Sequence, residues 1–252
     1  SDVVFTSLPG PSEVEAVALG EDGLMAGFAT GSAFFDLSTN SPTVMRRLHA
    51  TMQEKGVEVL DAPVSGGPDG AKSGKMAIWV GGDKTTFDKY KSVLDSMGDA
   101  ARYIGPIGAG SIAKLVHNLS GYILGSALAE TFTMGVKAGL EPDALWEAVR
   151  QGALGRRRTF DTMHRNYLPQ DFDPPNFALQ LARKDVALAC EVGREFDVPM
   201  KLAHTVLAEM TEAINRGWGH RDSRVAMMLQ NERAGVDIKV DSARLDEIVE
   251  ND

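Results

Sequence analysis

Lys114 and Asn118 stand four residues apart in a run with helical periodicity. Side chains at this spacing project from one face of an α-helix in consecutive turns, so an amine and an amide would meet the same ligand. The neighbours Leu115, Val116 and Leu119 make the helix apolar nearly all round, which indicates a buried element. Loss of water lowers the pKa of a lysine toward neutrality, where it can exchange protons as a general acid or base. The alternative is a solvated lysine beside a tolerated polar residue.

A second segment has the composition of an anion-binding turn. An apolar run ends at Leu60 and is followed directly by Asp61-Ala-Pro-Val-Ser-Gly-Gly67. Glycine-rich turns beyond the carboxyl end of a strand expose backbone N–H groups, which suit a carboxylate as well as a phosphate. Structural turns alone would explain some glycines of this region. For Ser65, Gly66 and Gly67 together we favour ligand binding.

A third segment, Gly108-Ala-Gly-Ser-Ile-Ala113, matches the G-x-G-x-x-A form of a dinucleotide fingerprint. That fingerprint requires a second strand ending in an acidic residue about 20 positions later. This position falls near Glu130, which is still inside the predicted helix. We therefore favour another interpretation, in which the glycines let the backbone turn sharply and approach a ligand where a helix begins.

The elements that must position these residues change character along the chain. Up to about Gly108, apolar runs alternate with helical segments, which predicts an α/β domain with a parallel sheet covered on both faces. We place this domain at residues 1–107. The predicted strands are 2–8, 32–37, 57–60 and 76–80. One helix is predicted to begin near Ser12, and a second to run from about 42 to 55.

Beyond Gly108 the pattern is helical, which predicts an all-helical domain over residues 108–252. It begins with one long interdomain helix from Ser111 to about Ala138, far longer than a crossover in a nucleotide-binding sheet requires. The tail from Val236 is charged and weakly periodic, so a frayed end and a partner-facing extension are both open. Further helices are predicted at 142–151, 176–196, 200–217 and 222–232.

Composition excludes several classes of partner. The net charge is −9 at pH 7 across 252 residues, so nucleic acid and anionic membrane surfaces would be repelled. No apolar run approaches the roughly 20 residues of a membrane span, and the amino terminus lacks the features of a signal peptide. The single cysteine, Cys190, suits a reducing cytosol and a small apolar position in a helix. We expect a cytoplasmic protein, and no metal site, because the histidines lack ligand spacing.

Taken together, these motifs resemble the β-hydroxyacid dehydrogenase family. Its members include 3-hydroxyisobutyrate dehydrogenase, tartronate semialdehyde reductase and, more distantly, 6-phosphogluconate dehydrogenase. The resemblance is carried by the Asp61–Gly74 segment and by Gly108-x-Gly-x-x-x-Lys-x-x-x-Asn118, and it continues in three shorter motifs. These are Leu8-Pro-Gly-Pro11, Asp36-Leu-Ser-Thr-x-x-Pro42 and Lys184-Asp-Val186.

The resemblance implies a role for each matching residue. Ser65, Gly66 and Gly67 would hold the substrate carboxylate, Lys114 would exchange the hydroxyl proton, and Asn118 would orient substrate and lysine. The cofactor, NAD or NADP, would be bordered by residues of three motifs: Leu8, Pro9, Thr39 and, from the helical domain, Lys184. The implied function is oxidation of a small β-hydroxyacid, such as 3-hydroxyisobutyrate, to its semialdehyde, or the reverse reduction.

The chain departs from the family pattern at its start. Ser1 begins what looks like the fourth strand of a Rossmann-type domain, so the glycine-rich phosphate loop and the ribose-binding residue would be missing. The expected fold class is thus a partial Rossmann-type α/β domain followed by an all-α domain. The alternative function is that of a non-catalytic remnant, which serves as an assembly or binding module. Imine reduction is a third possible function. The long apolar helix also favours a homodimer or homotetramer.

Overall fold

The computed structural model describes residues 1–157, 163–197 and 199–250. Contacts divide the chain into two compact units, and each is described by itself. The first comprises Ser1–Leu119 with Ala187–Pro199, and the second comprises Ser120–Val186 with Met200–Asp252. The division falls inside the long helix α6 (Ala109–Lys137), whereas the sequence predicts a domain boundary at the start of this helix.

The first unit contains a twisted sheet whose first three strands are parallel: β1 (Val3–Thr6), β2 (Ala33–Asp36) and β3 (Glu58–Asp61). Two helices return the chain between them, α1 (Pro11–Leu19) and α3 (Pro42–Gln53), each with proline in its first turn, where no N–H is needed. These elements confirm the predicted α/β alternation. A short helix, α2 (Leu24–Gly27), also lies between β1 and β2.

Beyond β3 the sheet is mixed, so the prediction of a parallel sheet is wrong for this part. The chain continues from β3 into a short strand and returns antiparallel, with one unbroken register from Asp61 opposite Gly81 to Ser65 opposite Ala77. Together β3 and β4 form one arm of a long hairpin, and a seven-residue helix occupies its tip. The new elements are β4 (Val64–Ser65), α4 (Gly67–Ser73) and β5 (Ala77–Gly81).

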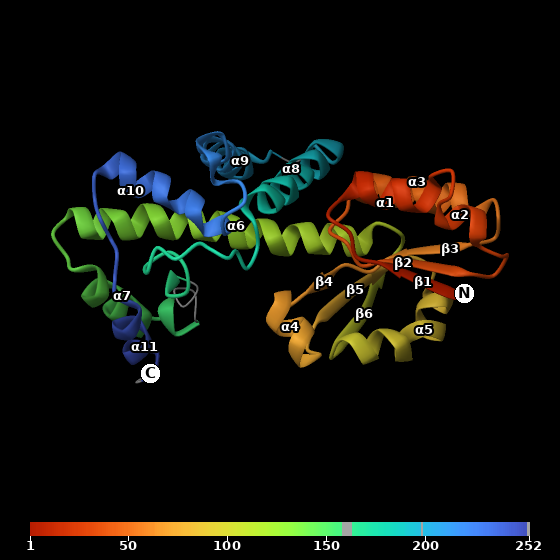
Figure 1. Cartoon of the computed structure of the whole chain (residues 1–252), viewed down its shortest axis with the longest axis horizontal. Helices are drawn as coiled ribbons and strands as arrows, with labels where there is room; N and C mark the ends of the chain where they lie inside the picture. Colours follow the sequence, from red (N-terminus) through yellow and green to blue (C-terminus); the bar gives the residue numbers. More distant parts are fainter. Residues whose placement is uncertain (158–162, 198, 251–252) are drawn as a thin grey trace. The chain divides into compact units, whose positions relative to one another are not determined.

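Helices cover both faces of this sheet, as predicted (Figure 1). α1 and α3 pack Val14, Met45 and Leu48 against one face, around Phe34 and Val59. The other face is covered by α5 (Lys84–Met97), which connects β5 to the parallel strand β6 (Ala100–Gly105). The core on that side includes Phe35, Leu60, Ile78, Phe87 and Leu94.

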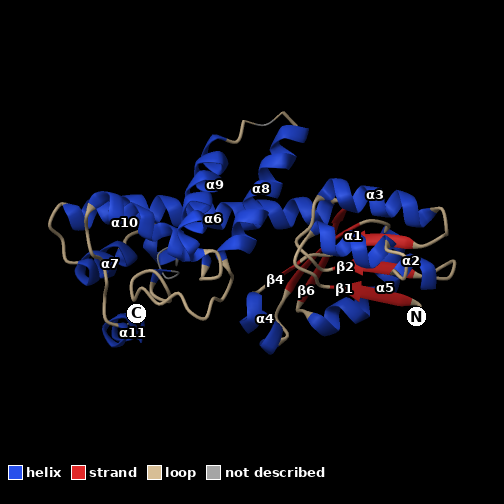
Figure 2. Cartoon of the chain, turned by 45° about the horizontal axis from the view of Figure 1, so that its top comes forward, coloured by secondary structure: helices blue, strands red, loops and turns tan. Residues whose placement is uncertain are grey.

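The second unit is built from helices, which confirms the all-α prediction (Figure 2). The downstream parts of α6 and the first part of α8 (Leu179–Glu195) belong to it. No helix in the described ranges is long and apolar enough to cross a membrane. The remaining helices are α7 (Pro142–Gln151), α9 (Lys201–Ala213), α10 (Met228–Ala234), α11 (Ser242–Glu250) and short turns at Gly155–Arg157, Ile214–Trp218 and Ser223–Met227.

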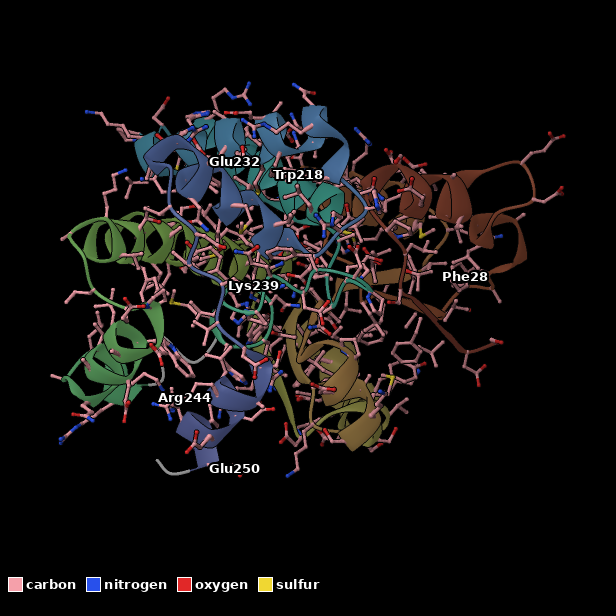
Figure 3. All side chains as sticks on the ribbon, turned by 60° about the vertical axis from the view of Figure 1, so that its left-hand side comes forward. Phe28, Trp218, Glu232, Lys239, Arg244 and Glu250 are labelled. Atoms are coloured by element: carbon pink, nitrogen blue, oxygen red, sulfur yellow. The ribbon has the colours of Figure 1, made fainter. Side chains whose placement is uncertain are left out.

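The carboxyl-terminal tail packs onto the second unit instead of fraying or extending. Ile238 and Leu245 are buried in the same core as Trp146 of α7. Figure 3 shows Lys239 on the segment that leads into α11, which carries Arg244 and ends at Glu250. The Arg244 guanidinium forms an ion pair with Glu147 of α7 at 3.4 Å, so charged contacts surround the apolar ones.

Candidate active site

Three polar residues end the three parallel strands side by side. The register places Thr6 of β1 next to Asp36 of β2, and Asp36 next to Asp61 of β3. Both carboxylates are 1% exposed. In open α/β sheets, ligands bind in the crevice beyond the carboxyl ends of the strands, which makes this edge the candidate site.

The Asp36 carboxylate joins the two loops that were predicted to border a cofactor. It accepts hydrogen bonds from Thr6 Oγ1 (2.9 Å), from the Ser38 amide (3.1 Å) and from Asn40 Nδ2 (2.7 Å). The Leu8 amide in turn donates to Ser38 Oγ at 2.8 Å. The loop that carries Leu8 and Pro9 is therefore fastened to the loop that carries Thr39.

The Asp61 carboxylate holds the start of α6. The backbone amides of Gly108 and Ser111 donate to its two oxygens at 2.7 and 2.5 Å. A carboxylate at this position satisfies amides that have no acceptor inside the helix, and it interacts favourably with the helix dipole. The Gly108–Ala113 motif thus turns sharply into a helix, as expected, but the anion at its start is the chain's own side chain.

Glycine allows α6 to approach the strands so closely. A Cβ atom on Gly110 would lie 2.6 Å from the Asp61 carbonyl oxygen, and one on Gly81 would lie 2.6 Å from Asp61 Oδ1. Gly108 has φ of 91°, which a residue with a side chain rarely adopts. These three glycines are explained by the geometry of the helix start.

One face of the hairpin is directed at α6. Side chains alternate along a strand, and the unbroken register puts Asp61, Pro63 and Ser65 on a common face. Trp79 lies directly opposite Pro63, to whose carbonyl its amide donates, so the indole is on this face as well. The Trp79 ring centroid lies 5.3 Å from that of His117 on α6.

Lys114 lies on α6 between two contacts with this face. Successive residues of a helix are about 100° apart, so Lys114 is displaced by only about 40° from Gly110 and about 60° from His117. Gly110 and His117 both contact the hairpin, the first at Asp61 and the second at Trp79. Lys114 is half-buried and lies between these two contacts along the helix axis.

Asn118 extends the same sector of the helix by one turn. Its Oδ1 atom lies 3.0 Å from Nδ1 of His117, and its side chain is half-buried. In the next sector Leu115 packs against Leu188 and Ala189 of α8. On the far side Val116 is 61% exposed, so the expectation that the helix is buried all round is wrong for the single chain.

The predicted carboxylate loop lies at the tip of the hairpin. Gly66 and Gly67 have φ of 142° and 58°, which favours glycine at both positions. Gly67 begins α4, and a Cβ atom there would meet no described atom within 4 Å, so the space beside it is open. Ser65 is half-buried and still paired with Ala77. Only the last residues of the predicted turn leave the sheet.

Lys184 belongs to the second unit, where its ammonium pairs with the buried carboxylate of Asp185 at 2.9 Å.

Cys190 is buried on α8, and burial raises the pKa of its thiol, as expected for a structural cysteine. Among the described residues, no group of three or more histidine, cysteine, aspartate or glutamate side chains could hold a metal ion.

The fastened loops at the carboxyl edge fit part of a dinucleotide. They offer the half-buried Leu8 and Thr39 and the exposed Pro9, a mixture of apolar surface and hydroxyl. Asp36 ends β2, and its oxygens accept three hydrogen bonds within the chain. The residues present therefore fit a cofactor along the loops, and Asp36 serves to hold those loops.

Sequence reasoning assigned no role to Asp36 or Asp61, although both lie within the quoted motifs. An acidic residue at the end of an apolar run was the available signal, because a carboxylate is buried there only if donors surround it. Burial raises the pKa of Asp61 to about 6, against the lowering effect of the Ser111 and Gly108 amides. The Gly108 and Ser111 donors lie 47 and 50 residues beyond Asp61 in the sequence, so spacing alone does not reveal them.

Comparison with protein families gives two matches that together span most of the chain. Residues 1–105 match the NAD binding domain of 6-phosphogluconate dehydrogenase. Residues 108–239 match the NAD-binding domain of NADP-dependent 3-hydroxyisobutyrate dehydrogenase. The cofactor is accordingly NAD or NADP.

Individual relatives agree with this result. The chain is 32% identical to 2-(hydroxymethyl)glutarate dehydrogenase of Eubacterium barkeri, over 94% of this chain and 79% of that protein. It is 33% identical to an NAD-dependent L-serine dehydrogenase of Pseudomonas aeruginosa, over 91% of this chain and 78% of that protein.

A solved structure supports the same assignment. The 3-hydroxyisobutyrate dehydrogenase of Mycobacterium tuberculosis, solved with L-serine, aligns with a TM-score of 0.79 and 28% identity, over 91% of this chain and 79% of that one. Matching family models, relatives above 30% identity and the shared fold lead to one conclusion. The chain belongs to the β-hydroxyacid dehydrogenase family of NAD(P)-dependent oxidoreductases.

Proposed function

We propose that this chain interconverts a small β-hydroxyacid and its semialdehyde, with Lys114 exchanging the hydroxyl proton. The observation that supports this most strongly is the position of Lys114 on α6, between two contacts of the helix with the hairpin that carries Ser65. A proton-transfer group is useful only when it lies within reach of a bound substrate. The glycine turn after Ser65 is the proposed site for the substrate carboxylate.

The relatives narrow the class of substrate. The proteins named above and a further relative are named for 2-(hydroxymethyl)glutarate, L-serine and 3-hydroxyisobutyrate. In each compound a hydroxymethyl group is attached to the carbon that bears a carboxylate. The third substituent differs: it is a carboxyethyl chain, an ammonium group or a methyl group. We expect this chain to act on a compound with the shared hydroxymethyl and carboxylate groups.

In the oxidation direction the neutral amine of Lys114 accepts the hydroxyl proton while the C–H bond breaks and the carbonyl forms. In reduction the Lys114 ammonium returns that proton to the oxygen. The nicotinamide group, when bound, accepts or supplies the hydride, which balances the electrons. Asn118 hydrogen-bonds the reacting oxygen and orients it toward Lys114, while Ser65, Gly66 and Gly67 bind the carboxylate.

The cofactor assignments belong to the same proposal. Leu8, Pro9 and Thr39 border the nicotinamide cofactor on the loops that Asp36 fastens together. Lys184 contributes to cofactor binding through its ammonium group. An aldehyde or alcohol held between these loops and Lys114 would exchange hydride at the reacting carbon and the proton at its oxygen.

The test is a panel of hydroxyacids with NAD and with NADP, read as formation of reduced nicotinamide. 3-Hydroxyisobutyrate, L-serine, 2-(hydroxymethyl)glutarate and glycerate differ only in the third substituent. Lys114→Ala should lower kcat by about 10² to 10⁴ while fluorescence shows that reduced cofactor still binds. Lys91→Ala is the matched control, since Lys91 pairs with Asp95 on the exposed side of α5.

Two results would contradict the proposal. Full activity of Lys114→Ala would remove this lysine from the reaction. Absence of any oxidation, together with no binding of reduced cofactor at millimolar concentration, would favour the non-catalytic binding module instead.

A further inference from the structure

We infer that Asp61 is a positioning residue for the reaction, because its carboxylate sets the place and the rotation of α6 and thereby aims Lys114 at the segment that ends in Ser65. The inference rests on the proposed function of Lys114. The Asp61 carboxylate contacts the start of α6 and lies against the adjoining strands.

Two hydrogen bonds to Asp61 hold the start of α6, whereas a single bond would allow the helix to rotate about it. One oxygen of Asp61 accepts the Gly108 amide and the other accepts the Ser111 amide, at 2.7 and 2.5 Å. One donor, Gly108, lies just before α6 and the other, Ser111, lies in its first turn. Asp61 is 1% exposed and cannot swing into solvent, which means that α6 cannot rotate without breaking one of these bonds.

Rotation at the helix start reaches Lys114 directly. Lys114 is only three residues beyond Ser111, less than one turn along a rigid α-helix. Its Nζ atom lies roughly 8 Å from the helix axis when the side chain is extended, so a 10° rotation moves it by roughly 1.5 Å. Displacement of a reacting group by about 1 Å can lower a rate by about 10²-fold.

Asp61 also belongs to the segment that carries the proposed carboxylate site. It lies four residues before Ser65 on the hairpin arm with the unbroken register. The same residue therefore contacts the helix of the proton-transfer group and continues into the strand that leads to the anion-binding turn. A shift of either element relative to the other would have to break the Asp61 contacts.

An ionised carboxylate offers an acceptor oxygen to each of the two backbone amides at the start of α6. An asparagine side chain would offer its oxygen to one backbone amide and its NH₂ group to the other. The NH₂ group and that second amide are both donors, so they could not form a hydrogen bond. The carboxylate is kept although burial disfavours its charged form and raises its pKa to about 6. Its pKa is set by burial, which raises it, and by the hydrogen bonds from Ser111 and Gly108, which lower it.

The decisive experiment observes Lys114 itself. The lysines are reductively dimethylated with carbon-13, and Lys114→Arg identifies the Lys114 methyl signal by NMR. In Asp61→Asn the Lys114 signal should move and titrate differently from wild type. Asp36→Asn is the matched control, since Asp36 is equally buried one strand away but bonds Thr6, Ser38 and Asn40 instead of α6, and it should leave the Lys114 signal in place.

Kinetics provide the second readout. Asp61→Asn should lower kcat by about 10- to 100-fold while the KM for the hydroxyacid changes less than about threefold, because the turn at Ser65 is intact. Wild type should lose activity as the pH falls through about 6, and this step should be absent in Asp61→Asn. A purely structural role would lower the fraction folded and leave the pH profile of the folded enzyme unchanged.

Each outcome separates this inference from the proposed function. An unchanged Lys114 signal in Asp61→Asn, or an equal shift in Asp36→Asn, overturns the positioning role. If Asp61→Asn does not fold, the wild-type Lys114 signal must itself show a step near pH 6, and absence of that step overturns the role. A third outcome is a chain that oxidises no hydroxyacid while its Lys114 signal still depends on Asp61. That result supports the positioning role of Asp61 and contradicts only the proposed function.

Discussion

At the scale of single residues, two buried carboxylates organise the candidate site in different ways. Asp36 accepts three hydrogen bonds from polar groups near the ends of β1 and β2, and so fastens loops together. Asp61 accepts its two bonds from a helix start and is surrounded by glycines. One carboxylate therefore shapes the loops proposed for the cofactor, and the other places the helix that bears Lys114.

A pair of glycines on α6 tests this close packing. Gly110→Ala puts a Cβ atom 2.6 Å from the Asp61 carbonyl oxygen, and should lower the free energy of unfolding by about 1 to 3 kcal/mol. Gly121→Ala on the same helix meets no described atom within 4 Å, and should raise it by about 0.5 to 1 kcal/mol. Urea unfolding measures both, and equal effects would contradict the proposed approach of helix and strand.

Sequence spacing indicated Lys114, Asn118 and the Ser65 turn because each pattern is local, within four residues on a helix or at the end of one apolar run. Both partners of Asp61 and one of the three partners of Asp36 lie far away in the sequence. Asp61 bonds residues 47 and 50 positions away, and Asp36 bonds Thr6 across 30 positions. Spacing in one sequence contains no information on such pairs, so the roles of Asp36 and Asp61 emerged only from the structure.

At the scale of elements, the hairpin of β3, β4 and β5 is the main departure from the predicted parallel sheet. Parallel strands require a crossover connection of about a dozen residues or more, usually with a helix packed on the sheet. Here most of the connection is taken up by β4 and the seven-residue α4, so the chain turns back along itself. A two-residue strand is too short for periodicity to reveal, whereas its pairing brings Ser65 onto the face that is directed at α6.

The Asp61 contact with α6 predicts an unusual pH dependence of stability. The pKa of Asp61 is about 6 in the folded chain against an ordinary value of 3.8, so the folded chain binds this proton more tightly than the unfolded chain does. The stabilisation from protonation is complete below about 3.8 and is lost as the pH rises through about 6. Wild type should therefore lose up to about 3 kcal/mol relative to Asp61→Asn between about pH 4 and pH 7.

Urea unfolding of wild type and Asp61→Asn across this interval checks the sign. A difference in the free energy of unfolding that stays constant with pH would show that the two forms of Asp61 fit the folded chain equally well.

The packing of the carboxyl-terminal tail leads to a separate prediction for the second unit. Ile238 is fully buried, so Ile238→Ala should lower the free energy of unfolding by about 2 to 4 kcal/mol. Lys239→Ala, at the exposed neighbouring position, should change it by less than about 0.5 kcal/mol. Similar small effects from both would mean that the tail contributes little to the core in solution.

At the scale of the whole molecule, the α/β and all-helical parts follow the two family matches at residues 1–105 and 108–239. The change from α/β to helical structure could be predicted because the period of the apolar residues changes from strand-like to helix-like near Gly108. The compact units instead share α6 and α8. Periodicity identifies where a helix begins, but it does not reveal which neighbours each half of the helix packs against.

Exposed apolar residues on α6 support the prediction of self-association. Val116 is 61% exposed and Leu124 is 41% exposed in the single chain. Light scattering should give a mass of two or four times 27.1 kDa, and glutamate at both positions should lower it by destabilising the shared surface. A mass of one chain for the wild type would contradict this prediction.

The most direct test of Lys114 as the proton-transfer group is chemical rescue. Lys114→Ala is assayed with saturating nicotinamide cofactor and the preferred hydroxyacid while methylamine or ethylamine is added. Turnover should rise with amine concentration in this variant, whereas wild type should not respond. Failure of every small amine to restore turnover in a folded, cofactor-binding Lys114→Ala chain would contradict the account.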